Sequence, residues 1–273
     1  MTTQTAPISD QGLTTPPVRR WLAISRRRAF LTHLLCSATV VAFVCLLMLF
    51  VWYPQPFFQI SNAWRPLRVL VGVDLVLGPA LTLLLFKPGK KGLLFDLVTI
   101  VLVQLAALIY GVTVIYTQRP YFNVFSVDRF VVQARKDVDA AEWTKVSGRF
   151  GGKPWIGPVW AIANLPKDAA GNQRIIQGLM SGGHDIEQRP ELWSPYKDGI
   201  AQVTARIKPL GTLKARQPAM QQRIDHLPAK LGLPPERVGF LPVVSGTRAL
   251  TLVMDSSSAA ILDVVDMDPW TGE

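Results

Sequence analysis

The polar side chains best placed to do chemistry in this sequence lie inside apolar segments. His33, Asp74, Asp96 and Gln104 each interrupt a run rich in Leu, Val, Ile and Ala. An aspartate in the middle of a membrane helix costs roughly 2.5–3.5 kcal/mol to insert, so such a residue usually faces protein or water and has a partner. At about 1.5 Å of helix per residue, Asp74 and Gln104 lie at similar depths, as do His33 and Asp96. The sequence therefore predicts two intramembrane polar pairs.

Small residues accompany these polar groups at helical spacing. Both stripes mix small with polar side chains, which suits the packing of membrane helices. They either hold the helices together or recognise a partner inside the membrane, and they are too few for a proton or ion relay. The stripes are Asp74, Gly78 and Thr82 in one apolar run and Asp96, Ile100, Gln104, Ala107 and Gly111 in the next.

Residues for catalysis or metal binding are scarce elsewhere. Cys36 and Cys45 lie in one apolar run, about 13 Å apart along a helix, so they cannot form a disulfide with each other. No second His or Cys stands at zinc-ligand spacing from any histidine, and no G-x-S-x-G, P-loop or H-E-x-x-H motif occurs. The densest carboxylates, Asp263, Asp266 and Asp268, fit a solvated face. The sequence predicts no cofactor and no enzymatic activity.

The elements that position the polar residues are three apolar runs, at residues 29–52, 69–86 and 93–115. Each approaches the roughly 20 residues that a helix needs to cross a bilayer. A charged leader precedes the first run, but the run is too long for the apolar core of a signal peptide and no A-x-A cleavage site follows. We therefore expect it to remain as a membrane helix.

The positive charge lies at the ends of these runs. The chain has 273 residues and a net charge of +10, yet 49% of its residues are hydrophobic, only 18% are charged, and its mean hydropathy is +0.25. This distribution is typical of membrane topology and argues against a nucleic-acid partner. The positive-inside rule places the N-terminus and the turn between the second and third runs in the cytoplasm, and residues 117–273 outside. The deciding residues are Arg26, Arg27, Arg28, Lys87, Lys90 and Lys91.

The predicted organisation is a membrane protein with three transmembrane helices followed by an α+β periplasmic domain. Residues 1–28 form a largely disordered cytoplasmic tail, with disorder expected over 1–18, residues 29–116 form the transmembrane domain, and residues 117–273 form the outer domain. An aromatic belt is expected at the outer membrane surface, made of Trp52, Tyr53, Phe57, Phe58 and Trp64.

The outer domain mixes strand and helix patterns. Strands are predicted at residues 121–127, 129–134 and 159–164, and amphipathic helices at 169–181, 196–207 and 212–232. Two final apolar runs, 249–254 and 260–265, flank the sequence Asp255-Ser256-Ser257-Ser258 and predict a hairpin with a turn at the serines.

Several segments resemble the type IV pilin accessory protein family, also described as TfpZ-type fimbrial assembly accessory proteins. The likeness runs from about Ser25 to Pro269-Trp270 and is most specific in the apolar half. It rests on Trp52-Tyr53-Pro54, Gly72-Val73-Asp74-Leu75-Val76-Leu77-Gly78-Pro79, Lys87-Pro88-Gly89-Lys90-Lys91, Gln104-Leu105-Ala106-Ala107-Leu108-Ile109-Tyr110-Gly111, Arg119-Pro120, Val127-Asp128-Arg129-Phe130 and Gly157-Pro158.

The resemblance implies a bacterial inner-membrane protein that assists or modulates type IV pilus assembly by binding pilin or the assembly machinery, with membrane lipids around it and no enzymatic activity. Pilins of this class carry a glutamate near the cytoplasmic start of their membrane helix. A protonated His33 could bridge that glutamate and Asp96. The alternative is that His33 and Asp96 pair only within the bundle.

Two other classes of function are alternatives to an accessory role in pilus assembly. One is a polytopic enzyme that acts on a lipid-linked substrate or modifies pilin at the periplasmic face. Its only close candidate residues are Asp128 and Arg129, which a strand-end ion pair explains more simply. The other is a sensor, for which the cytoplasmic side offers only a short tail and the lysine turn, too little for an output domain.

Overall fold

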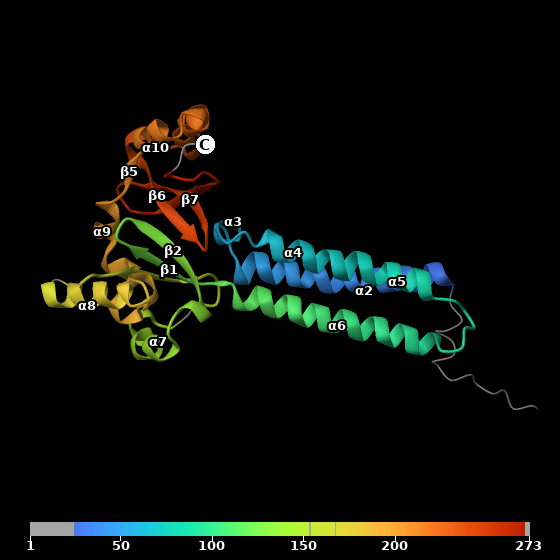
Figure 1. The fold of residues 1–273 in the computed structure, drawn as a ribbon. Helices are drawn as coiled ribbons and strands as arrows, with labels where there is room; N and C mark the ends of the chain where they lie inside the picture. Colours follow the sequence, from blue (N-terminus) through green and yellow to red (C-terminus); the bar gives the residue numbers. More distant parts are fainter. Residues whose placement is uncertain (1–24, 153, 167, 271–273) are drawn as a thin grey trace, which may run out of the picture. The chain divides into compact units, whose positions relative to one another are not determined.

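The computed structural model describes residues 25–152, 154–166 and 168–270 (Figure 1). The tail predicted at residues 1–18 lies outside the described residues. The described chain forms two compact units. The helical unit contains residues 25–41 and 70–109, and the sheet unit contains residues 42–69 and 110–270.

Three long apolar helices confirm the predicted number of spans. The first joins α2 (Arg26–Leu47) to a π-helical turn, η1 (Met48–Trp52). The second joins α4 (Trp64–Val71), the π-helical η2 (Gly72–Leu77) and α5 (Gly78–Leu85). The third is α6 (Leu93–Thr117). With 27, 22 and 25 residues, these helices are long and apolar enough to cross a bilayer.

The second span starts earlier than its apolar run predicts. It begins at Trp64 and not at Val69. Arg65 and Arg68 give its first turns the composition of a polar loop, but Leu67 between them is buried. This stretch is therefore an amphipathic helix that continues directly into the apolar run.

The surface of the helical unit is largely apolar. Leu35, Leu84 and Phe95 each expose two thirds or more of their area, at 67%, 71% and 75%. Exposed apolar area of this kind suits contact with lipid and not with water. At one end of the unit, Arg26 Nε donates a hydrogen bond to the Phe86 carbonyl over 3.0 Å, which ties the start of α2 to the end of α5.

A mixed sheet forms the centre of the sheet unit. Its order is β4-β3-β1-β2-β6-β7-β8, and the short β5 pairs with β6. The β1–β3 and β2–β6 pairs are parallel, and the others are antiparallel. The strands are β1 (Pro120–Ser126), β2 (Arg129–Ala134), β3 (Val159–Ala163), β4 (Trp193–Pro195), β5 (Lys208–Pro209), β6 (Val238–Ser245), β7 (Arg248–Asp255) and β8 (Ile261–Val265).

Short helices lie before and between the strands of the sheet unit, and Figure 1 labels most of them. Asp139 and Asp168 begin α7 and α8 by accepting hydrogen bonds from backbone N–H groups of the first turn. The helices are α3 (Phe57–Ile60), α7 (Ala140–Val146), α8 (Ala169–Met180), α9 (Ile200–Thr204), α10 (Leu210–Arg216) and α11 (Gln221–Leu231).

The structure confirms the strands predicted at 121–134 and 159–164, the helix at 169–181 and the final hairpin. Two helix predictions are wrong in extent. The segment 196–207 contains a 3₁₀ turn and the five-residue α9, which Gly199 separates. The segment 212–232 is broken into α10 and α11 at Pro218, because a proline disfavours the helical conformation in the residue before it, Gln217.

The predicted serine turn is held by Asp255. Its carboxylate accepts hydrogen bonds from the Ser257 N–H at 2.8 Å and the Ser257 hydroxyl at 2.6 Å, and it is paired with Arg237. The Ser257 hydroxyl and N–H, with Arg237, hold the pKa of the Asp255 carboxyl well below its usual range.

The aromatic belt prediction is wrong for Tyr53 and Phe57. Both are buried, and Phe57 packs with Ile60 in the same cluster as Phe130 of the sheet. The Tyr53 hydroxyl donates to the Ile115 carbonyl over 2.7 Å. Tyr53 and Phe57 thus contribute apolar area to a protein core.

Candidate intramembrane site

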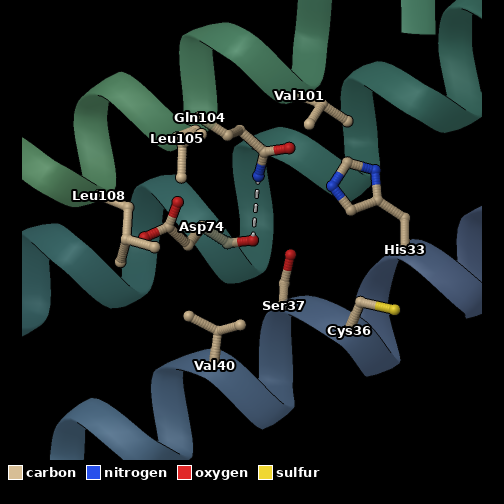
Figure 2. A pocket seen from close by; sticks show the side chains of 9 residues that line it. All are labelled: His33, Cys36, Ser37, Val40, Asp74, Val101, Gln104, Leu105 and Leu108. Atoms are coloured by element: carbon tan, nitrogen blue, oxygen red, sulfur yellow. Dashed lines mark hydrogen bonds between the residues drawn. The ribbon is translucent and has the colours of Figure 1, made fainter. Parts of the chain in front are cut away.

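A groove lies between three helices of the helical unit. Its volume is about 210 Å³, and its walls come from α2, η2 and α6 (Figure 2). The walls are mostly apolar; η2 contributes Asp74 and α6 contributes Gln104, while the other polar groups come from α2. The lining residues are His33, Cys36, Ser37, Val40, Asp74, Val101, Gln104, Leu105 and Leu108.

Asp74 projects from the π-helical η2. Pro79 lacks the N–H that would bond the carbonyl four residues earlier, and Gly78 N–H bonds the Val73 carbonyl five residues back. The helix is thereby wider at this point, and π-helical turns of this kind are frequent at functional sites. The local sequence before Pro79 therefore places an aspartate at an irregular part of the second span.

Asp74 is a buried residue whose carboxylate has no partner among the described residues. The residue is 5% exposed, and no hydrogen bond or ion pair reaches its carboxylate from the described residues. Gln104 Nε2 donates to the backbone carbonyl of Asp74 over a long 3.4 Å. Figure 2 shows the carboxylate turned away from this bond, on the side of Leu105 and Leu108. The predicted proximity of Asp74 and Gln104 is confirmed, but the bond is made by the backbone.

The other predicted pair is wrong. His33 Nδ1 is hydrogen-bonded to the Thr82 hydroxyl at 2.5 Å, and Asp96 pairs with Lys90 at 2.5 Å. Equal depth was a sufficient reason to expect His33 beside Asp96, but the lysine turn supplies a closer cation for Asp96. In the structure His33 and Asp96 thus have different partners, Thr82 and Lys90.

Gly78 allows α5 to lie close to the Gln104 side chain of α6. A β-carbon at this position would overlap the side-chain amide of Gln104. The small residue is therefore required where α5 meets α6, as packing of membrane helices through small residues predicts. Gly111, the other predicted small residue, belongs to the part of α6 in the sheet unit and does not line the groove.

The predicted topology residues are exposed. Arg26 and Lys90 make the contacts already described, and Arg27, Arg28, Lys87 and Lys91 are solvent-accessible.

The carboxylates of the sheet unit that the sequence analysis singled out make separate contacts. Arg129 Nε pairs with Asp128 at 3.0 Å, and Asp263 and Asp266 pair with Lys230 and Arg248. Asp268 accepts from the backbone N–H of Trp270. In the described part of the chain, no group of three His, Cys, Asp or Glu side chains could hold a metal ion.

Glu187 is a titratable residue that the sequence pattern did not single out. Burial raises the pKa of its carboxyl, and the Ser126 hydroxyl donates to it over 3.3 Å. It stands on a 3₁₀ turn in an irregular segment, Ile186–Gln188, which has no periodicity from which its burial could be predicted.

Three apolar helices that can span a bilayer, joined to an α+β unit, define the class of this chain as a multi-span membrane protein with a globular domain.

The family model described as "Fimbrial assembly protein FimB" matches residues 20–62. The fimbrial assembly protein of serogroup I from Dichelobacter nodosus is 31% identical over 244 residues, which cover 87% of this chain and 93% of that protein. The serogroup E1 protein of the same organism is 30% identical over 245 residues, with the same coverage. The chain belongs to the family of fimbrial assembly proteins. No solved structure matches it.

Proposed function

We propose that this protein is an inner-membrane accessory factor of the type IV pilin accessory class, which assists pilus assembly by binding pilin or another assembly component. Its family and the names of its relatives support a role in fimbrial assembly. In this proposal the protein acts by binding, and the carboxylates of Asp128, Asp263 and Asp266 each pair with a separate cation.

The observation that carries the proposal is the unpartnered carboxylate of Asp74 in an open groove. A buried polar group without a hydrogen bond costs about 1–3 kcal/mol, and more when it is charged. A membrane helix that enters the groove and donates a hydrogen bond to this carboxylate recovers that cost. A pilin, which waits in the membrane with one apolar helix, is such a partner.

The orientation in this proposal has the N-terminus and the lysine turn in the cytoplasm and the sheet unit in the periplasm. A reporter that is active only in the periplasm is expected to be active after Glu273 and silent when inserted at residues 87–91, because these positions flank an odd number of spans. The opposite pattern would contradict the orientation.

The functional test is complementation of a strain that lacks the gene. We expect deletion to lower the number of surface pili while pilin is still made and processed, and the wild-type gene to restore them. Asp74→Leu should fail to restore them although the protein is present at normal level, since only the partner's contact is lost. Asp96→Asn is the matched control, because Asp96 already has Lys90 as its partner. Unchanged piliation, twitching and DNA uptake on deletion would refute the proposal.

The two native cysteines allow the site itself to be tested in the same cells. Cys36 lines the groove and Cys45 does not. A photoreactive maleimide placed on Cys36, in a Cys45→Ser background, should crosslink pilin, and Asp74→Leu should reduce the yield per molecule at least tenfold, about the effect of 1.4 kcal/mol. Equal crosslinking from Cys45 in a Cys36→Ser background would show that the groove is not the binding site.

A further inference from the structure

A second, more polar cavity lies within the sheet unit. Its volume is about 470 Å³. It is lined by the loop before α4, by the residue after α6 and by the hairpin tip between β6 and β7. The lining residues are Tyr53, Ile60, Ser61, Asn62, Ala63, Arg65, Pro66, Gln118, Ser245, Gly246, Thr247 and Arg248.

Residues at one end of each of the three spans line the cavity. Tyr53 follows the last residue of the first span, Arg65 stands in the first turn of the second, and Gln118 follows the last residue of the third. Because the spans cross the apolar part of a bilayer, residues at their ends lie at the depth of the lipid headgroups. The position in sequence alone thus places this cavity at one membrane surface.

The charge of the cavity is positive. Two guanidinium groups line it, and its lining contains no carboxylate. Arg248 donates to the Gln59 carbonyl over 2.7 Å and to Asp266 over 2.5 Å, so part of its charge is balanced. The guanidinium of Arg65 has no hydrogen bond or ion pair with any residue that the structure describes, and it stands at the positive end of a helix dipole.

Hydroxyl and amide groups around the arginines are also available. The Ser61 hydroxyl oxygen is buried with no hydrogen-bond partner among the described residues. Within the same part of the chain, the side chains of Gln118 and Thr247 make no hydrogen bond. Guanidinium, hydroxyl and amide donors around a space without acidic groups are the chemistry that binds phosphate oxygens.

We propose that this cavity binds the phosphate group of an anionic phospholipid headgroup. Arg65 contributes the uncompensated charge, Arg248 a second guanidinium, and Ser61 a buried hydroxyl that donates to a phosphate oxygen. The bound headgroup connects the loop at residues 53–63, the start of α4 and the β6–β7 hairpin, all of which belong to the sheet unit. This role is independent of the groove around Asp74.

The test uses the full-length protein, purified in a neutral detergent and stripped of lipid. Short-chain phosphatidylglycerol should raise its Tm in a saturable way, whereas diacylglycerol with the same acyl chains and no phosphate should not. Arg65→Gln should weaken phosphatidylglycerol binding about tenfold, as expected for the loss of a charge-assisted hydrogen bond. Arg68→Gln is the matched control, since Arg68 is exposed on the same helix but does not line the cavity.

A second variant keeps the test independent of charge. Ser61→Ala should leave the Tm of the lipid-free protein unchanged or raised, because it removes an unsatisfied buried hydroxyl, and should still weaken lipid binding. If inorganic phosphate binds and both Arg65→Gln and Ser61→Ala weaken that binding as they weaken lipid binding, the cavity is a phosphate site whose ligand is a soluble anion. Equal losses in Arg65→Gln and Arg68→Gln, or equal effects of diacylglycerol and phosphatidylglycerol, would overturn the proposal.

Discussion

Asp74 and Asn123, which belong to different units, are both buried residues whose polar side-chain atoms have no partner among the described residues. Asp74 of the helical unit is 5% exposed, and Asn123 of the sheet unit is 0% exposed. Asp74 lines an open groove between three helices. Asn123 lies on β1, where its pairs are Val132 on β2 and Trp160 on β3, and both its amide oxygen and its amide nitrogen are unsatisfied.

The difference between the two sites is access. Burial without a hydrogen bond costs free energy in both places. A partner can reach Asp74 through the groove and recover that cost, whereas Asn123 is enclosed between neighbouring strands. Burial of a polar group is therefore weak evidence of function by itself, and the open groove is what makes Asp74 the stronger functional candidate.

The two units also differ in how they are packed. The sheet unit has large apolar clusters, including Phe122, Trp143 and Trp193, whose rings lie 4.8–6.3 Å apart between centroids. The helical unit has a small apolar cluster around Phe86, a close approach at Gly78 and isolated polar contacts. A substitution that adds volume at Gly78 should thus be costly.

The largest expected effect is that of Gly78→Leu. The new side chain would occupy the space of the Gln104 amide, break its bond to the Asp74 carbonyl and separate α5 from α6. We expect the free energy of unfolding in detergent to fall by about 2–3 kcal/mol, in the range of overpacking in a well-packed core. Thermal denaturation of the purified protein measures this change.

Gly72→Leu is the control for Gly78→Leu, because a β-carbon at Gly72 meets nothing within 4 Å. It should change stability by less than about 0.5 kcal/mol, as surface substitutions usually do. The smaller Gly78→Ala should be partly rescued by Gln104→Ala, which removes the group it would strike. Equal losses at Gly72 and Gly78 would mean that the close contact with Gln104 does not determine stability.

The sequence was sufficient to predict the elements whose patterns are long and regular. The three spans follow from apolar runs, and β7 and β8 from two apolar runs around a serine turn. β6 was not predicted, although it pairs with β2, β5 and β7, because Gly239 and Pro242 are turn-forming residues by composition. In the structure Gly239 is required because a β-carbon there would strike Ile207, and Pro242 stands between the β5 and β2 pairings.

The candidate site was predictable in depth but not in atomic detail. Helix rise alone brought Asp74 and Gln104 to the same level. It does not determine that the π-helical turn before Pro79 directs the Asp74 carboxylate away from Gln104, nor that Thr82 pairs with His33. The polar cavity was not predicted, because Arg65 and Arg248 are 183 residues apart and only the packing of residues 53–63 against the sheet brings them together.

The smaller expected effect, that of Asn123→Val, tests the comparison directly. Valine favours strands and has no polar atoms to satisfy, so the free energy of unfolding should rise by about 1–2 kcal/mol. Asn164→Val is the matched control, because the Asn164 amide donates to the Ser194 hydroxyl at 2.8 Å and accepts from Gln202 at 3.2 Å. That variant should be destabilised, and the Tm of both proteins in the same detergent measures the contrast. Loss of stability in Asn123→Val would show that the buried amide stabilises the sheet. The lack of a hydrogen-bond partner would then also fail to show that Asp74 costs free energy.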